Sequence, residues 1–264
     1  MPEGNEIHRF AERHAAAFAG KRVQVDSPNG GFPDAAVLNN RTLQTVEAYG
    51  KHLGYVFGRG LILHIHLGMY GDFWEGDMPM PEEKGALRLR MWTRNQWMEL
   101  RGAMDCSIFD EKKWQTLRAR IGPDPLRPES DPEPAFAVIE KRATPIGLLL
   151  MDQSVIGGIG NIFRAELLYR ARISPWRPGQ DVTKPALRGI WREAKTLMRG
   201  AMDDRRIVTT RVKDRPHKRG PAEDHEVHYA YRRAGKPCFV CGATIKKADM
   251  GGRTVYWCPQ CQKE

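Results

Sequence analysis

The chain of 264 residues has no apolar run long enough to cross a membrane, and its first residues are polar and acidic. A membrane helix needs about 20 mostly apolar residues, and a signal or transit peptide is not acidic at its start. The five cysteines are an odd number, and four of them lie in the last 27 residues, unlike a secreted disulfide framework. We expect a soluble, cytoplasmic and monomeric protein with no membrane contact.

Positive charge is concentrated near the end of the chain. The formal net charge is +10, and residues 205–264 contain 14 Lys and Arg against 6 Asp and Glu. The preceding part is nearly neutral, with 28 basic and 26 acidic residues. A basic region of this kind is typical of a protein that binds a polyanion, and nucleic acid is the expected partner.

The first ten residues, MPEGNEIHRF, place a proline and a carboxylate ahead of an amphipathic helix that Gly20 is expected to end. One interpretation is structural: Pro2 suits a first helical turn, and Glu3 suits the positive end of the helix dipole. A chemical role for these two residues needs support from the rest of the chain. The helical spacing of three and four is carried by Ile7, Phe10, His14 and Phe18.

Short segments with strand character follow without intervening helices. Alternation is clear between residues 61 and 67 and between residues 87 and 91, and TRNQ at 93–96 fits a hairpin turn. Such a succession predicts an antiparallel sandwich or barrel. The predicted strand segments are 21–26, 41–57, 60–74, 86–92 and 97–109.

The sequence PDPLRPESDPEP at 123–134 contains five prolines and four acidic residues, and it is expected to be an inter-domain linker. Helical periodicity follows, and residues 205–228 form a long basic loop of a kind that is usually functional or disordered. We therefore predict an α+β protein of two domains with a terminal ribbon. The predicted limits are 1–122 for the N-terminal helix and β-sandwich, 135–232 for the helical domain and 233–264 for the ribbon. The helical segments are 134–152, 161–173 and 183–204.

Two CxxC pairs, Cys238–Cys241 and Cys258–Cys261, are separated by sixteen residues. This spacing is typical of a tetrahedral zinc site closed by four thiolates, which leaves no position for a reacting water. We expect one structural Zn²⁺ per chain, which stabilises a ribbon too small to fold unaided. Cys106 is interpreted as a small buried side chain.

Between the cysteine pairs, two short strands around Gly-Gly place Arg253 near a hairpin tip, either as a solvated side chain or as a phosphate ligand. In GGIGNIFRAELL, Gly160 precedes a helix that starts near Asn161. Exposed N–H groups at such a start bind phosphate, although glycine-rich helix starts are common. No Lys-Ser/Thr follows, so a nucleotide-binding loop is not indicated.

Lys51 follows Gly50 between two strand segments, and the usual meaning of such a residue is a solvated turn. A phosphate or proton-transfer role is the alternative. Met69 and Tyr70 stand between two glycines in HLGMYG. They are either core residues beside an ordinary turn or an exposed wedge of the kind that separates base pairs.

Together, the N-terminal Pro-Glu, the early Gly-Lys, GIGNIFRAELLYRARISP after the proline-rich segment and the ribbon with its arginine resemble the formamidopyrimidine-DNA glycosylase and endonuclease VIII family. GPDPL at 122–126 and RRAGKPCFVCGATI at 232–245 add to the resemblance, which covers nearly the whole chain. It implies a bacterial base-excision repair enzyme, associated with the nucleoid, that acts on damaged DNA. It also implies that the helical domain is a helix-two-turn-helix domain.

The resemblance implies a role for each of these residues. After removal of Met1, the secondary amine of Pro2 would attack the sugar C1′ of a damaged nucleotide, with Glu3 as the proton donor and Glu6 in support. Lys51 would serve β-elimination and Arg253 δ-elimination. The DNA-binding residues would be Asn161 and Gly160, Arg120, and Met69 with Tyr70 as the wedge. The loop at 205–228 would cover the extruded base.

Departures from the family pattern bear on the substrate. The segment RGAMDCSIFDE at 101–111 lacks the Arg-Phe pair of the formamidopyrimidine branch, and Tyr70 and the YGK around Lys51 are similar to endonuclease VIII. Oxidised pyrimidines are therefore the expected lesions, as in an actinobacterial-type second copy of endonuclease VIII. Two alternatives stay open: a glycosylase for 8-oxoguanine and formamidopyrimidine lesions, and a nucleic-acid-binding protein that keeps the scaffold without catalysis.

Overall fold

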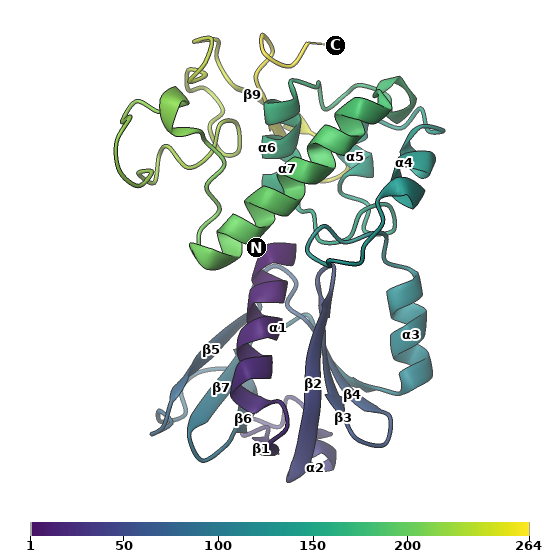
Figure 1. Cartoon of the computed structure of the whole chain (residues 1–264). Helices are drawn as coiled ribbons and strands as arrows, with labels where there is room; N and C mark the ends of the chain where they lie inside the picture. Colours follow the sequence, from purple (N-terminus) through teal and green to yellow (C-terminus); the bar gives the residue numbers. More distant parts are fainter. Residues whose placement is uncertain (1, 264) are drawn as a thin grey trace. The chain divides into compact units, whose positions relative to one another are not determined.

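The computed structural model describes residues 2–263, which divide into two compact units at Arg120 and Ile121. We call them the N-terminal unit and the C-terminal unit (Figure 1). Within the described residues, none of the helices has the length and apolar character needed to span a bilayer.

The N-terminal unit begins with α1 and continues almost entirely as strands. Its helices are α1 (Gly4–Phe18), α2 (Ala35–Leu38) and α3 (Glu111–Ala119). Its strands are β1 (Arg22–Asp26), β2 (Arg41–Tyr49), β3 (His52–Phe57), β4 (Leu61–His66), β5 (Asp72–Asp77), β6 (Leu87–Trp92), β7 (Gln96–Arg101) and β8 (Asp105–Phe109). The predicted strand segments are all present, and α3 is a helix that the sequence analysis did not identify.

All strand pairs are antiparallel, in the order β5-β7-β6-β1-β2-β3-β4-β8. β1 pairs with β2 through its first residues and with β6 through its last, so it belongs to both halves of the sheet. Side chains of both halves, such as Leu53 and Leu89, meet in one core, which is the packing of a folded-over, sandwich-like sheet. Helix α1 joins this core through Ile7, Phe10 and Phe18, each 1% exposed.

The other face of β3, β4 and β8 is covered by α3. Trp114 is 1% exposed and packs with Ile62 and Phe109. Gly54 of β3 is required there, because a Cβ atom would lie 2.5 Å from the Trp114 ring. Asp110 caps α3 by accepting a hydrogen bond from the Lys113 N–H at 2.6 Å.

The C-terminal unit is built around two helices, α6 (Asn161–Ala171) and α7 (Lys184–Asp203), which lie side by side in Figure 1. The predicted helical segment at 134–152 is two short helices, α4 (Glu133–Ile139) and α5 (Ile146–Leu149). The proline-rich segment has no strand, and α4 begins near its end. Its Leu126 is 5% exposed and packs in the core of this unit. Two one-turn 3₁₀ helices cover Gly179–Asp181 and Val212–Asp214.

The basic loop at 205–228 is fixed to the helices by a buried carboxylate. Glu166 of α6 is 0% exposed and accepts N–H groups of Tyr229, Ala230 and Tyr231 at 2.7–2.8 Å. It also accepts the Thr209 hydroxyl, so the two ends of the loop are held on one side chain. The chain then ends in a hairpin of β9 (Lys246–Asp249) and β10 (Thr254–Trp257).

Candidate active site and metal centre

Pro2 and Glu3 lie immediately before α1, not inside its first turn. The helix begins at Gly4 with Glu3 as its N-cap, and the Glu3 carbonyl accepts the N–H groups of Glu6 and Ile7. Proline's suitability for a first helical turn therefore does not explain Pro2. Glu3 is 1% exposed. The structure thus places a half-buried proline and a buried carboxylic acid at one tip of the N-terminal unit.

Polar contacts as well as the apolar core fix the direction of α1. His14 is 0% exposed, and its Nδ1 lies 2.5 Å from the Tyr55 hydroxyl of β3. Its Nε2 lies 3.1 Å from a Glu75 carboxylate oxygen of β5. Burial lowers the pKa of His14, so the imidazole is neutral at pH 7. At the other end, Arg9 donates to Glu6 through Nε at 3.2 Å. The helix is therefore held by contacts with both halves of the sheet.

Lys51 occupies the tight turn between β2 and β3. Gly50 has a φ of +58°, a conformation that favours glycine. The turn joins Tyr49 and His52, which pair directly across the two strands. Lys51 is half-buried and is therefore more than a fully solvated turn residue.

Met69 and Tyr70 lie on an exposed turn between β4 and β5. Tyr70 is 83% exposed and Met69 is 48% exposed, so neither is a core residue. Gly68 has a φ of +68°, and a Cβ on Gly71 would lie 2.3 Å from the Leu67 carbonyl oxygen. The two glycines therefore create the turn that presents the two large side chains.

Arg120 caps the C-terminal end of α3 and is exposed.

In the C-terminal unit, the helix start and the hairpin that bears Arg253 are linked directly. Gly160 is the N-cap of α6, and Asn161 Nδ2 donates to the Thr254 carbonyl at 3.0 Å. Arg164, 0% exposed, donates to Asn161 Oδ1 and to the same carbonyl. Arg253, next to Thr254, is exposed. Sequence reasoning missed Arg164, because its partner residue lies about 90 positions further along the chain.

The four cysteines form one cluster. Their sulfur atoms all lie within 4.8 Å of one another, with Cys238–Cys261 at 3.9 Å and Cys241–Cys258 at 3.5 Å. Zn–S bonds of about 2.3 Å in a tetrahedron require sulfur atoms about 3.8 Å apart, so the donor set fits one Zn²⁺. The Tyr169 hydroxyl lies 2.9 Å from Cys238 Sγ and connects the cluster to α6.

A second group of possible donors lies in the basic loop. It consists of His217, Glu223 and His225, whose donor atoms also lie within 4.8 Å of one another. All three side chains are more than half exposed, and Nδ1 of each histidine lies 3.4–3.5 Å from a Glu223 carboxylate oxygen. This group is a surface cluster to which we assign no metal.

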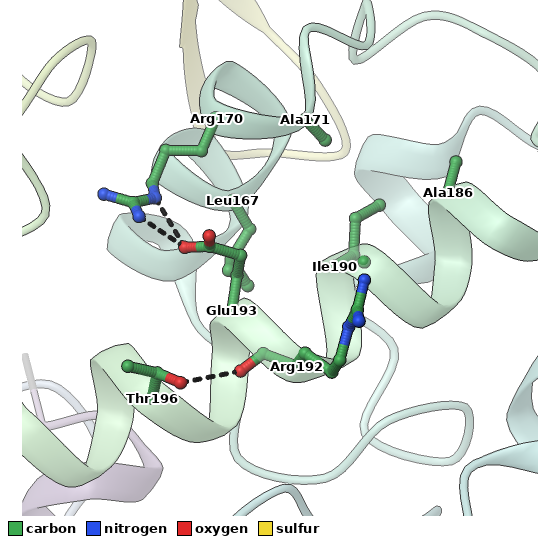
Figure 2. Close-up of a pocket in the computed structure, with 9 residues that line it drawn as sticks. Leu167, Arg170, Ala171, Ala186, Ile190, Arg192, Glu193 and Thr196 are labelled. Carbon is green, nitrogen blue, oxygen red and sulfur yellow. Dashed lines mark hydrogen bonds and ion pairs between the residues drawn. The ribbon is translucent and has the colours of Figure 1, made fainter.

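A pocket of about 330 Å³ opens between α6 and α7 (Figure 2). Its lining is apolar at Leu167 and Ile190 and charged at Arg170, Arg192 and Glu193. Arg170 Nε donates to Glu193 at 2.6 Å, so these two charges compensate each other. The pocket contains no predicted site residue, and we assign it no part in catalysis.

Comparison with family models defines the class of protein. The formamidopyrimidine-DNA glycosylase N-terminal domain matches residues 1–105, the H2TH domain of the same glycosylase matches 121–212, and the zinc finger found in FPG and IleRS matches 235–263. The three occur in this order and cover most of the chain, as in a DNA repair glycosylase with a zinc finger.

Whole-chain relatives narrow the class further. The chain is 42% identical to "Endonuclease 8 1" of Mycobacterium tuberculosis, over 99% of this chain and 100% of that protein. It is 31% identical to "Probable endonuclease 8 2" of Streptomyces coelicolor, over 99% and 94% of the two chains. The chain belongs to the formamidopyrimidine-DNA glycosylase and endonuclease VIII family, a family of DNA glycosylases and abasic-site lyases. The fold is also that of the Lactococcus lactis Fpg in complex with abasic-site DNA, with a TM-score of 0.80, 20% identity and coverage of 99% and 100%.

Proposed function

We propose that the chain is a bifunctional DNA glycosylase and abasic-site lyase whose nucleophile is the N-terminal amine of Pro2, exposed once Met1 is removed. The observation that carries this proposal is the pairing of Pro2 with the buried Glu3 carboxyl group outside the first turn of α1. A helix start alone requires neither residue.

The chemistry follows from ordinary acid–base properties. An α-amino group has a pKa of about 7.7–8.0, so about a tenth of it is neutral at pH 7, far more than for an ordinary lysine. The neutral nitrogen forms a bond to C1′ while the bond from C1′ to the base breaks; the attached nitrogen then loses its proton, and the departing base takes one up. Glu3 donates a proton to the sugar ring oxygen, which opens the ring and leaves an iminium ion on Pro2.

Strand cleavage requires further proton transfers and phosphate contacts. Loss of a proton from C2′ expels the 3′ phosphate in β-elimination, which we assign to the neighbourhood of Lys51. A second elimination expels the 5′ phosphate, which we assign to Arg253. Glu6 supports the acid end of α1, where it is already paired with Arg9.

We further propose damaged DNA as the partner and oxidised pyrimidines as the preferred lesions. The missing Arg-Phe pair at 101–111 and the 42% identity to a protein named endonuclease 8 support this choice. Exposed Met69 and Tyr70 suit a wedge in the space left by an extruded base. The N–H groups at the start of α6, together with Asn161, would bind one phosphate of the DNA backbone. Arg120 would bind a further phosphate. The domain limits 1–122, 135–232 and 233–264, a monomeric state and a location with the bacterial nucleoid belong to the same proposal.

Borohydride trapping tests the proposal. The substrates are a 5-hydroxyuracil duplex and an abasic-site duplex, with Pro2→Gly as the variant. We expect a covalent adduct on both, mapped to residue 2. An adduct on the abasic duplex alone would favour another lesion, with 8-oxoguanine tested next. No adduct on either duplex, despite tight binding and confirmed removal of Met1, would show a nucleic-acid-binding protein without catalysis.

A further inference from the structure

The outer face of β3, β4 and β8 changes from apolar at one end to polar at the other. Under α3 it is apolar, with Ile62, Phe109 and Trp114 packed together. Towards the turn that carries Lys51, the same face instead presents imidazoles. Buried imidazoles must be hydrogen-bonded to avoid a desolvation cost that apolar side chains do not have. Polar groups in such a place are expected where function requires them.

Two of these imidazoles form a hydrogen-bonded chain with a carboxylate. His64 Nδ1 lies 2.7 Å from Asp105 Oδ2, and His64 Nε2 lies 2.9 Å from His52 Nδ1. His64 is 4% exposed. Ser107 donates to the same Asp105 oxygen at 3.0 Å. The chain thus runs from β8 across β4 to the first residue of β3, which directly follows Lys51.

The hydrogen-bonded chain from Asp105 through His64 to His52 determines which imidazole nitrogens carry hydrogen. A carboxylate only accepts hydrogen bonds, so His64 Nδ1 carries the hydrogen and points it at Asp105. The other nitrogen of a neutral His64 must then accept, so His52 donates from Nδ1. His52 therefore has a fixed tautomer, with Nε2 as a hydrogen-bond acceptor.

The surroundings keep the imidazoles neutral. Burial, together with His66, His64 and Lys51, lowers the pKa of His52 to about 3, against the opposite effect of Asp105. Burial also lowers the pKa of His64, against Asp105 and with a contribution from Lys113. The pKa of His66 is lowered by burial and by Lys51.

We propose that the chain Asp105–His64–His52 is a positioning device for Lys51. It makes the start of β3 rigid and fixes the tautomer of a neutral imidazole at His52, the residue that directly follows Lys51. The role of Lys51 itself rests on the proposed function. His52, His64 and Asp105 are positioning residues that act through Lys51.

A fixed position of Lys51 matters because the rate of a reaction depends strongly on the position of the reacting group. A displacement of about 1 Å at a reacting group can lower a rate by up to about a hundredfold. Lys51 sits on a short turn, and a chain that connects three strands restricts that turn from its β3 side. A protonated His52 would add a second positive charge there, and burial disfavours that protonation.

His64→Phe is the decisive variant. Phenylalanine suits the apolar neighbours of His64, whose ring already stacks on Phe109 at 4.4 Å, so folding is expected to be retained. The hydrogen-bonded chain is nevertheless broken. The matched control is Glu47→Gln, a carboxyl-to-amide change at the apolar end of the same face, where Glu47 accepts from the Trp114 indole at 3.1 Å.

Two readouts need no catalysis. In the free protein, imidazole ¹⁵N spectra are expected to show the Nδ1–H tautomer for His52, and a mixture of tautomers in His64→Phe. Backbone order parameters at residues 50–52 should fall from about 0.85 towards 0.6 in the variant. An unchanged tautomer or unchanged order would overturn the proposal even if the enzyme proved inactive.

The third readout is the single-turnover rate of β-elimination on an abasic-site duplex. We expect His64→Phe to lower this rate about tenfold while the Kd for DNA changes less than about threefold. In a Lys51→Ala background the same substitution should have almost no further effect. Equal losses in both backgrounds would show that the chain does not act through Lys51. Failure of the wild type to form any adduct would reject the proposed function, and the two spectroscopic readouts would still decide whether the chain orders the turn.

Discussion

The two ends of the chain carry the proposed reactive residues, Pro2 with Glu3 at one end and Arg253 at the other, and different interactions hold the two ends in place. At the N-terminal end, α1 is fixed by apolar burial, with Ile7, Phe10 and Phe18 almost inaccessible to solvent. At the C-terminal end, the β9–β10 hairpin has strands of only four residues each and depends on four thiolates. Apolar burial is a property of the folded chain alone, whereas the hairpin also depends on metal supply. Each end can therefore be disturbed without the other.

Removal of zinc should have the largest effect and should be confined to one end. Structural zinc sites of this kind bind with apparent free energies on the order of 10 kcal/mol. Chelation, or Cys258→Ser, should abolish hydrogen-exchange protection across residues 235–263 while protection of α1 stays unchanged. Hydrogen exchange with mass spectrometry and zinc content per chain measure this. Cys106→Ala is the control, because Cys106 is not part of the cluster and zinc content should stay at one. Loss of protection in α1 as well would contradict the separation of the two ends.

Phe10→Ala should disturb the opposite end. Phe10 is 1% exposed and its ring packs edge-on against Phe73 at 4.8 Å. Deletion of such a ring costs about 3–5 kcal/mol of unfolding free energy. Urea titration should show this loss at unchanged zinc content. Val37→Ala, at a side chain that is 42% exposed, should change stability by less than about 0.5 kcal/mol. Release of zinc by Phe10→Ala would show that the ends are coupled.

Glu166→Gln should loosen the basic loop without affecting either end. A glutamine amide cannot accept all the N–H groups that the Glu166 carboxylate accepts, which leaves buried donors unpaired. The expected cost is about 3 kcal/mol, with faster proteolysis within residues 205–228. Glu193→Gln is the control, because that half-exposed carboxylate pairs with Arg170 and contributes less than about 1 kcal/mol. Equal rates of proteolysis in both variants would show that Glu166 does not anchor the basic loop.

Local signals in the sequence predicted a large part of this molecule. The CxxC spacing predicted the zinc cluster, and the alternation in residues 61–67 predicted β4. Helix α3 was missed because Trp114 is its one buried side chain, too little for an apolar periodicity. The contacts of Glu166, Arg164 and the Asp105–His64–His52 chain join residues far apart in sequence, so no local pattern could reveal them. The roles of Pro2, Glu3, Lys51 and Arg253 rest on the family resemblance and stay predictions.

Acid should lower the free energy of unfolding of the N-terminal unit by more than its number of histidines alone suggests. Burial lowers the pKa of His14, His64 and His66, and burial, with His66, His64 and Lys51, lowers that of His52 to about 3. The unfolded state then binds more protons than the folded state below pH 6.5, so stability is complete above about pH 6.5 and falls as the pH drops towards 3. For His52 alone the loss between pH 7 and 5.5 is about 1 kcal/mol.

Urea titrations of the zinc-saturated protein at pH 7 and 5.5, read through hydrogen exchange in α1 and β3, measure this loss. His52→Phe should flatten the pH dependence there, because a phenylalanine has no proton to take up on unfolding. His225→Phe, at an exposed histidine in the basic loop, should leave it unchanged. An equal slope in wild type and His52→Phe would mean that the imidazole is not held neutral. The tautomer assignment of His52 would then fail with it, since a charged His52 would carry hydrogen on both ring nitrogens.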